Sequence, residues 1–120
     1  LFDGIALKNY LKNCPENITI LVKDIVASAG SVMTMGANTI KMYSDSELMI
    51  NNPWTFTAGD AVQLRKLAGD LEKAQTSLEE AYLTRFSATR NKLKTLLDEE
   101  TWLSPIQAIQ YNLADQEIKI

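Results

Sequence analysis

Residues 18–31 read ITILVKDIVASAGS, and this stretch decides the fold class. Residues 18–22 are mostly β-branched and have the length of one buried strand, whereas residues 27–37 are rich in small side chains and predict a tightly packed helix that begins near Ser28. Two more strands are expected at residues 39–43 and 47–50, separated by the turn-forming Ser44-Asp45-Ser46. Strands that alternate with helices in this way predict an α/β domain.

Helical patterns flank this region on both sides. Residues 1–13 predict a short amphipathic helix, and the apolar repeat over about residues 57–86 predicts the longest helix, with Thr57 as its N-terminal cap. The outer face of the long helix is expected to carry four charged residues: Glu72, Lys73, Glu79 and Glu80. A further helix is expected over residues 90–97, a capped helix start at Ser104-Pro105, and a short strand over residues 117–120.

The composition restricts the chemistry that one domain of this size can perform. The chain has 120 residues, of which 46% are hydrophobic, and this fits a single globular domain with one core. It contains no histidine, which excludes a histidine general base and a histidine-bound metal. Cys14 is the single cysteine, so neither a disulfide nor a paired-cysteine metal site is expected, and a reducing, cytoplasmic location is predicted.

Charge and hydropathy indicate what the protein does not bind. The formal net charge is −3, and no basic block could follow a phosphate backbone, so nucleic acid is not an expected partner. No apolar run approaches the roughly 20 residues that span a bilayer, and no signal sequence is recognisable at Leu1, so no membrane association or export is expected.

Three separated motifs carry a resemblance to a known family: VASAGS at residues 26–31, LMINNPW at 48–54 and ETWLS at 100–104. Their order and spacing resemble the Clp-type serine peptidases, and most of all the phage and prophage head maturation proteases. FDGIA at residues 2–6 matches as well, so that the resemblance covers essentially the whole chain.

The resemblance implies a Clp/crotonase-like spiral of β-β-α units with a long helical handle. Residues 1–56 and 101–120 would form the head of a single domain, and residues 57–100 the handle region. The family's first strands and its Gly-Gly turn, which supplies one oxyanion donor, would then precede Leu1.

Carried over position by position, the resemblance makes Ser28 the nucleophile, the Ala29 N–H an oxyanion donor and Glu100 the acid. A helix N-terminus suits such a nucleophile because its free N–H groups favour negative charge on the attacked carbonyl. The histidine of the family maps to Asn51. Because asparagine has no titratable nitrogen, Asn51 cannot accept the Ser28 proton, and the chain is expected to be nearly inert as a protease.

Other assignments of these residues remain open. Ser31 is a second and weaker nucleophile candidate, better explained as a packing residue. A lysine base, Lys23 or Lys41, would restore activity if its amine reached Ser28 in a desolvated pocket. Trp54 and Trp102 are expected to anchor the core near the site.

The sequence therefore predicts a Clp-type serine endopeptidase of prophage, capsid-related origin, with its activity impaired at Asn51. The alternative is a non-catalytic, ring-forming assembly protein of the same fold. A third hypothesis, an acyl-CoA enzyme of the same superfamily, has no residue in its favour. The resemblance further implies a homo-oligomeric ring built through the handle helix, a peptide or protein substrate and an ATP-dependent unfoldase as partner. No cofactor is implied, because nothing resembles a phosphate-binding loop.

Overall fold

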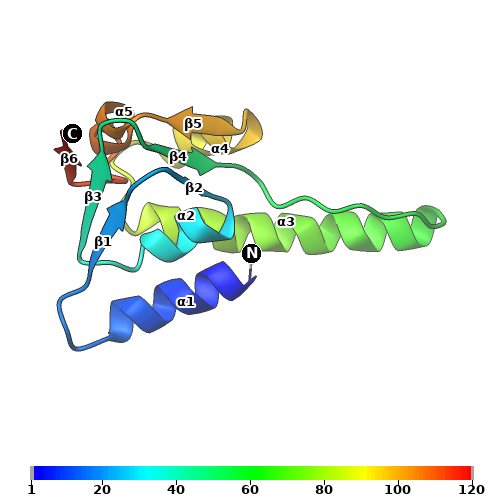
Figure 1. Ribbon diagram of the computed structural model, residues 1–120. Helices are drawn as coiled ribbons and strands as arrows, with labels where there is room; N and C mark the ends of the chain where they lie inside the picture. The colour runs from blue at the N-terminus through cyan, green and yellow to red at the C-terminus, as the bar shows by residue number, and fades with distance from the viewer. Residues whose placement is uncertain (1, 120) are drawn as a thin grey trace.

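Six short strands form two three-stranded sheets in the computed structural model, which describes residues 2–119 (Figure 1). The first sheet contains β1 (Thr19–Val22), β3 (Thr39–Tyr43) and β6 (Gln116–Ile118), in that order. The second contains β2 (Ile25–Ala27), β4 (Glu47–Ile50) and β5 (Thr101–Leu103), in that order. All pairs are parallel except β4 with β5, which is antiparallel.

The chain advances through these sheets in β-β-α units. β1 is followed by β2 and then by α2 (Ala29–Thr34), and β3 is followed by β4 and then by α3 (Ala61–Leu83). Each unit gives one strand to each sheet, with Thr19 paired to Thr39 in the first sheet and Ile25 paired to Glu47 in the second. This arrangement confirms the predicted mixed α/β architecture, including the strands at residues 39–43 and 47–50.

Two short strands, β2 and β5, were not expected from the sequence. Each is three residues long, which is too short for a period-2 pattern to identify. Both flank β4 and take their hydrogen bonds from it. Their extended conformation is therefore decided by pairing with β4 and not by local propensity.

Helices cover the inner faces of the sheets and complete one hydrophobic core. The core includes buried residues from both sheets and from the helices α3, α4 (Arg90–Asp98) and α5 (Pro105–Gln110). Its largest fully buried side chains include Tyr82, Ile40, Leu48, Leu78 and Leu93. α5 begins as predicted, because Ser104 caps it in a reciprocal capping box with Gln107, ahead of Pro105. β6 lies close to the predicted C-terminal strand, of which Ile120 falls outside the described residues.

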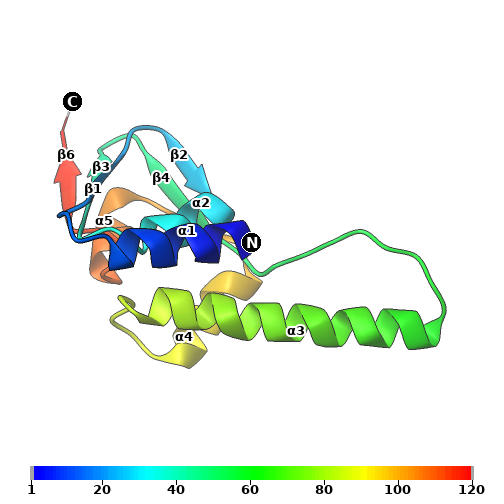
Figure 2. The same cartoon turned by 90° about the horizontal axis from the view of Figure 1, so that it is seen from below.

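The long helix α3 begins later than predicted and is only half covered. Its cap is Asp60 and not Thr57, because Asp60 and Gln63 each accept a hydrogen bond from the other's backbone N–H, both at 2.9 Å. The buried residues of α3 start at Ala74, whereas Leu64 remains 43% exposed. In both views the first half of α3 and the extended segment 51–60 project away from the sheets (Figures 1 and 2).

One charged residue of α3 lies on the inner face and not on the outer face where it was expected. Glu79 is only 3% exposed. The α3–α4 connection brings Arg90 back over α3. Its Nε donates to Glu79 Oε1 at 3.0 Å, and its Nη2 donates to Glu80 Oε1 at 2.6 Å. The ion pair allows the carboxylate to be buried, which no pattern within α3 itself could indicate. Among the helices of the described residues, none is both long and apolar enough to cross a bilayer.

The helix α1 (Phe2–Asn13) packs closely along α2, and two glycines make this approach possible. A Cβ added at Gly36 would overlap the backbone carbonyl of Lys8, and one added at Gly4 would lie 2.6 Å from the carbonyl oxygen of Ala29. The first turn of α1 therefore rests directly on the first residue of α2.

Gly36→Ala is expected to lower the free energy of unfolding by about 1–3 kcal/mol, because the added methyl group forces α1 away from α2. Gly69 is the matched control, since a Cβ there would meet no atom within 4 Å. Gly69→Ala should raise the free energy of unfolding by about 0.5–1 kcal/mol through helix propensity alone. Urea unfolding measures both changes, and a stabilising Gly36→Ala would contradict the close approach.

Candidate active site

Ser28 occupies a strained turn between β2 and α2. Its backbone angles are φ 53° and ψ −120°, a left-handed conformation that favours glycine. Serine in such a conformation costs on the order of 1–3 kcal/mol and persists only where the surrounding structure enforces it. The Ser28 side chain is exposed and makes no capping hydrogen bond to α2, so its hydroxyl points outward and is free for chemistry. Strand–turn–helix geometry of this kind is how several hydrolase folds present a nucleophilic serine.

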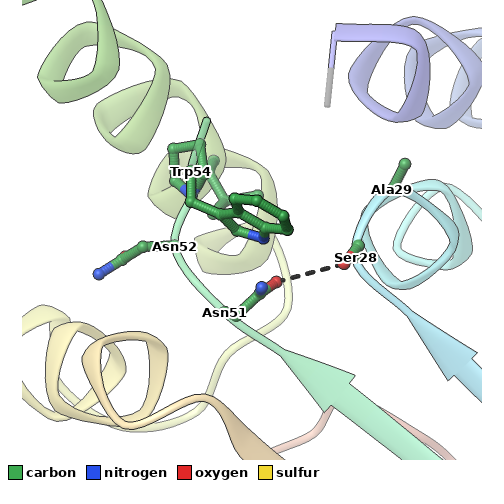
Figure 3. Close-up of a pocket in the computed structure, with 7 residues that line it drawn as sticks. Ser28, Ala29, Asn51, Asn52 and Trp54 are labelled. Carbon is green, nitrogen blue, oxygen red and sulfur yellow. Dashed lines mark hydrogen bonds between the residues drawn. The ribbon is translucent and has the colours of Figure 1, made fainter. Parts of the chain in front are cut away.

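A cavity of about 170 Å³ opens beside this turn. Its lining residues come from the start of α2, the segment after β4 and the middle of α3: Ser28, Ala29, Asn51, Asn52, Pro53, Trp54 and Leu78. Figure 3 shows Ser28 and Asn51 facing each other across it, with Trp54 beside them. The structure thus brings together three of the four residues that the sequence predicted for the site, namely Ser28, Ala29 and Asn51.

The contact between Ser28 and Asn51 is a long hydrogen bond. Ser28 Oγ donates to Asn51 Oδ1 at 3.5 Å, the outer limit for such a bond. An amide oxygen accepts a hydrogen bond but does not take up a proton near neutral pH. The pair therefore orients the Ser28 hydroxyl without converting it to an alkoxide.

The structure does not bring Glu100 into this cavity. Glu100 lies in the turn after α4 with φ 49°, its side chain is exposed, and it is not among the described residues that line the cavity. The pairing of β4 with β5 ends at Ile50 and Thr101. Glu100 would face Asn51 only if the two strands continued to pair by one more residue. The turn conformation, which links the Glu100 N–H to the Leu97 carbonyl at 3.2 Å, directs the backbone away from further pairing.

A different acidic residue holds the segment after β4 in place. Asp98 Oδ1 accepts a hydrogen bond from Asn52 Nδ2 at 2.6 Å, and the Asn52 N–H donates to the Leu97 carbonyl at 3.3 Å. The sequence predicted a role for Glu100 and none for Asp98, so this contact was missed. The sequence signal for the Asp98–Asn52 contact is the amide side chain of Asn52, which directly follows Asn51.

The remaining candidates are placed as follows. The exposed Lys23 and the half-buried Lys41 are both absent from the described lining of the cavity. Ser31 is fully buried, and its hydroxyl donates to the Met49 carbonyl at 2.6 Å, which confirms it as a packing residue. Within the described part of the chain, no group of three or more acidic or cysteine side chains could hold a metal ion.

The prediction that both tryptophans anchor the core is wrong. Trp54 is 67% exposed and Trp102 is 45% exposed. Trp54 follows Pro53 in the projecting segment, where it lines the cavity and its ring lies perpendicular to that of Phe56, with ring centroids 5.3 Å apart. Trp102 belongs to β5, an edge strand whose outward positions face solvent.

An exposed serine in a strained strand-to-helix turn beside a cavity is an arrangement that serine hydrolases use. The family model of the Clp protease matches residues 1–120, and the chain belongs to this family, whose members are serine-type peptidases.

Curated relatives are similar over nearly the whole chain. The chain is 25% identical to the ATP-dependent Clp protease proteolytic subunit 1 of Protochlamydia amoebophila (strain UWE25), over 97% of this chain and 58% of the relative. It is also 25% identical to the proteins of the same name from Chlamydia abortus and Chlamydia muridarum, in each case over 93% of this chain and 60% of the relative. The chain therefore spans about six-tenths of the length of these relatives.

The strain at Ser28 can be measured from stability. Ser28→Gly is expected to have a free energy of unfolding at least about 1 kcal/mol higher than Ser28→Ala, because both variants lack the hydroxyl and only glycine is relaxed at φ 53°. Ser77, exposed within α3, is the control position. There the order should reverse, with alanine about 1 kcal/mol more stable than glycine. Urea unfolding of the four variants decides the question, and the same order at both positions would contradict a strained turn.

Proposed function

We propose that this chain carries the catalytic site of a Clp-type serine endopeptidase, in which Ser28 is the nucleophile and the Ala29 N–H is an oxyanion donor. The single observation behind this proposal is the backbone of Ser28, held at φ 53° between β2 and α2 with its side chain exposed in a cavity. A packing serine would have no reason to keep a conformation that costs stability and exposes its hydroxyl.

In the proposed reaction, Ser28 Oγ attacks the carbonyl carbon of a peptide bond. The oxyanion that forms lies at the N-terminus of α2, where the first N–H groups of the helix are free to donate. The tetrahedral intermediate collapses with release of the amine product, and water then hydrolyses the acyl-enzyme. Glu100 stays the proposed acid from the family resemblance, and its exposed side chain would have to turn towards position 51 to orient a base there.

We infer that hydrolysis by this site is slow because Asn51 stands where the base is needed. The Ser28 hydroxyl donates to the Asn51 amide oxygen 3.5 Å away, and among the described residues no side chain that lines the cavity is titratable. Serine peptidases that lose the base retain a rate of about 10³ to 10⁴ over water, supplied by the oxyanion hole and by binding. A comparable residual rate is the expectation here.

Membership of the Clp protease family also suggests the substrate, the partner, the origin and the location of this chain. The relatives are named as subunits of an ATP-dependent protease, so a protein or peptide substrate and an ATP-dependent unfoldase are proposed as partners of this chain. The LMINNPW motif supports an origin among phage head maturation proteases, and a cytoplasmic location follows from that role. Residues 1–56 and 101–120 are proposed as the head, and residues 57–100 as the handle.

Asn51 also favours a second candidate, a non-catalytic ring-forming subunit of the same fold. In that role the chain would keep its packing and its contacts with other copies while binding peptides without cleaving them. The two candidates differ in the reactivity of one oxygen atom, Ser28 Oγ.

A fluorophosphonate probe, which labels activated serines, separates the two candidates. The native protein should label slowly or not at all, and Asn51→His should label Ser28 at least about 10³-fold faster. The labelling rate of Asn51→His should rise with pH around the ordinary histidine pKa of about 6.5, since only the neutral imidazole accepts the proton.

Controls for the labelling assign the modified residue. Asn51→His combined with Ser28→Ala should not label, and peptide mass spectrometry locates the modification. Rapid labelling of the native protein would overturn the non-catalytic candidate. Absence of labelling in a folded Asn51→His variant would overturn Ser28 as the nucleophile.

Self-association through the handle is expected from the exposed apolar residues at its outer end. Val62 is 73% exposed and Phe56 is 89% exposed, and a soluble monomer rarely leaves such residues clustered without a partner. The double variant Val62→Glu, Leu64→Glu should shift the sedimentation coefficient towards that of the monomer. Ser77→Glu adds a charge at another exposed position of α3 and should not change the assembly. A purely monomeric native protein would contradict the proposal.

A further inference from the structure

One buried hydroxyl connects the two segments that carry Ser28 and Asn51. Ser31 is completely buried, and its Oγ lies 2.6 Å from the Met49 carbonyl oxygen of β4 and 3.2 Å from the Val26 carbonyl oxygen of β2. Ser31 follows Ser28 by three residues, which is about one helical turn, and Met49 precedes Asn51 by two. The Ser31–Met49 hydrogen bond therefore ties the start of α2 to the end of β4, close to the site on both sides.

The long helix α3 belongs to the same buried region. Tyr82 is 1% exposed, and burial raises the pKa of its phenol, which therefore stays protonated. Tyr82 shares one hydrophobic core with Val32, the residue after Ser31 in α2. The hydroxyl of Ser31 thus makes its contacts with the backbone carbonyls of β4 and β2 in a region that is shielded from water.

The direct contact across the site is too weak to set its own geometry. Ser28 Oγ and Asn51 Oδ1 are 3.5 Å apart, whereas the Ser31–Met49 bond is 2.6 Å long and shielded from water. A strained turn such as that of Ser28 persists only where neighbouring contacts over-determine it. The two carbonyl groups that Ser31 reaches belong to the strand that leads into this turn and to the strand that leads to Asn51.

We propose that Ser31 is a positioning residue, which holds the Ser28 turn in its strained conformation and sets the spacing between the nucleophile and the base position. The stability part of this proposal stands on geometry alone, and its catalytic part rests on the proposed function of Ser28. Thr34 provides a matched control. It is equally buried in α2, but its hydroxyl donates at 2.7 Å to Gly30 of the same helix and does not reach β4.

The first experiment needs no catalysis. The difference in Tm between Ser28→Gly and Ser28→Ala reports the strain of the turn and is measured in three backgrounds: native, Ser31→Ala and Thr34→Val. The difference should fall by at least half with Ser31→Ala, because the turn can relax, and should stay unchanged with Thr34→Val. An equal difference in all three backgrounds would overturn the proposal.

The second experiment uses the fluorophosphonate labelling rate in the Asn51→His background. Ser31→Ala should lower the maximal rate about tenfold, the effect of roughly one hydrogen bond, while leaving the half-saturating probe concentration and the pH midpoint unchanged. Labelling should still reach one probe per chain, which separates a positioning effect from partial unfolding. Thr34→Val should label at the parental rate. An unchanged maximal rate with Ser31→Ala would overturn the catalytic part.

The two experiments fail in distinguishable ways. If Asn51→His does not label at all, the proposed function is wrong, and the Tm comparison still decides whether Ser31 holds the turn. If Ser31→Ala does not fold, Ser31→Cys replaces it, because a thiol fills nearly the same space but is a much weaker hydrogen-bond donor. A smaller Tm difference between Ser28→Gly and Ser28→Ala in that background supports the proposal, and an unchanged difference overturns it.

Discussion

The parallel pairing of β2 with β4 is the constraint on which the rest of the structure depends. Its register sets Ala27 against Met49, so that both strands end at the same edge of the sheet. The residues that follow, Ser28 and Asn51, are therefore brought within 3.5 Å although 23 positions separate them in sequence. Parallel strands can be joined only by a crossover, and here α2 supplies it and places its N-terminus at this edge. The pairing of β2 with β4 and the crossover through α2 therefore create the candidate site together.

The site combines costly geometry with an incomplete proton-transfer chain. Ser28 retains a backbone conformation that disfavours every residue except glycine, and its hydroxyl faces a cavity whose described lining has no titratable side chain. Strain of this kind is found at functional sites because it presents a side chain that a relaxed turn would withdraw. The strained turn thus presents the proposed nucleophile, and Asn51 stands at the position proposed for its base.

The handle helix has two halves with different physical roles. From Ala74 onward α3 belongs to the core, where Leu78 lines the cavity and Tyr82 is buried. Before that point the helix projects together with the segment 51–60 (Figure 2). Trp54 and Phe56 of this segment are exposed. One continuous helix therefore connects the exposed end of the molecule to the contacts beneath the nucleophile.

The sequence by itself determined the alternation of strands and helices and the cap at Ser104, because periodicity and capping are local signals, whereas the pairing of Ser28 with Asn51 was expected only from the family resemblance. It did not determine β2 or β5, the burial of Glu79 or the exposure of the tryptophans. Only the tertiary structure decided these, since a three-residue strand is held by its neighbour and a carboxylate can be buried only where a guanidinium meets it. The same holds for Asp98, which contacts Asn52 while Glu100 faces solvent. The choice between two carboxylates two residues apart depends on the turn that ends α4, and that turn is set by packing against β4 and β5.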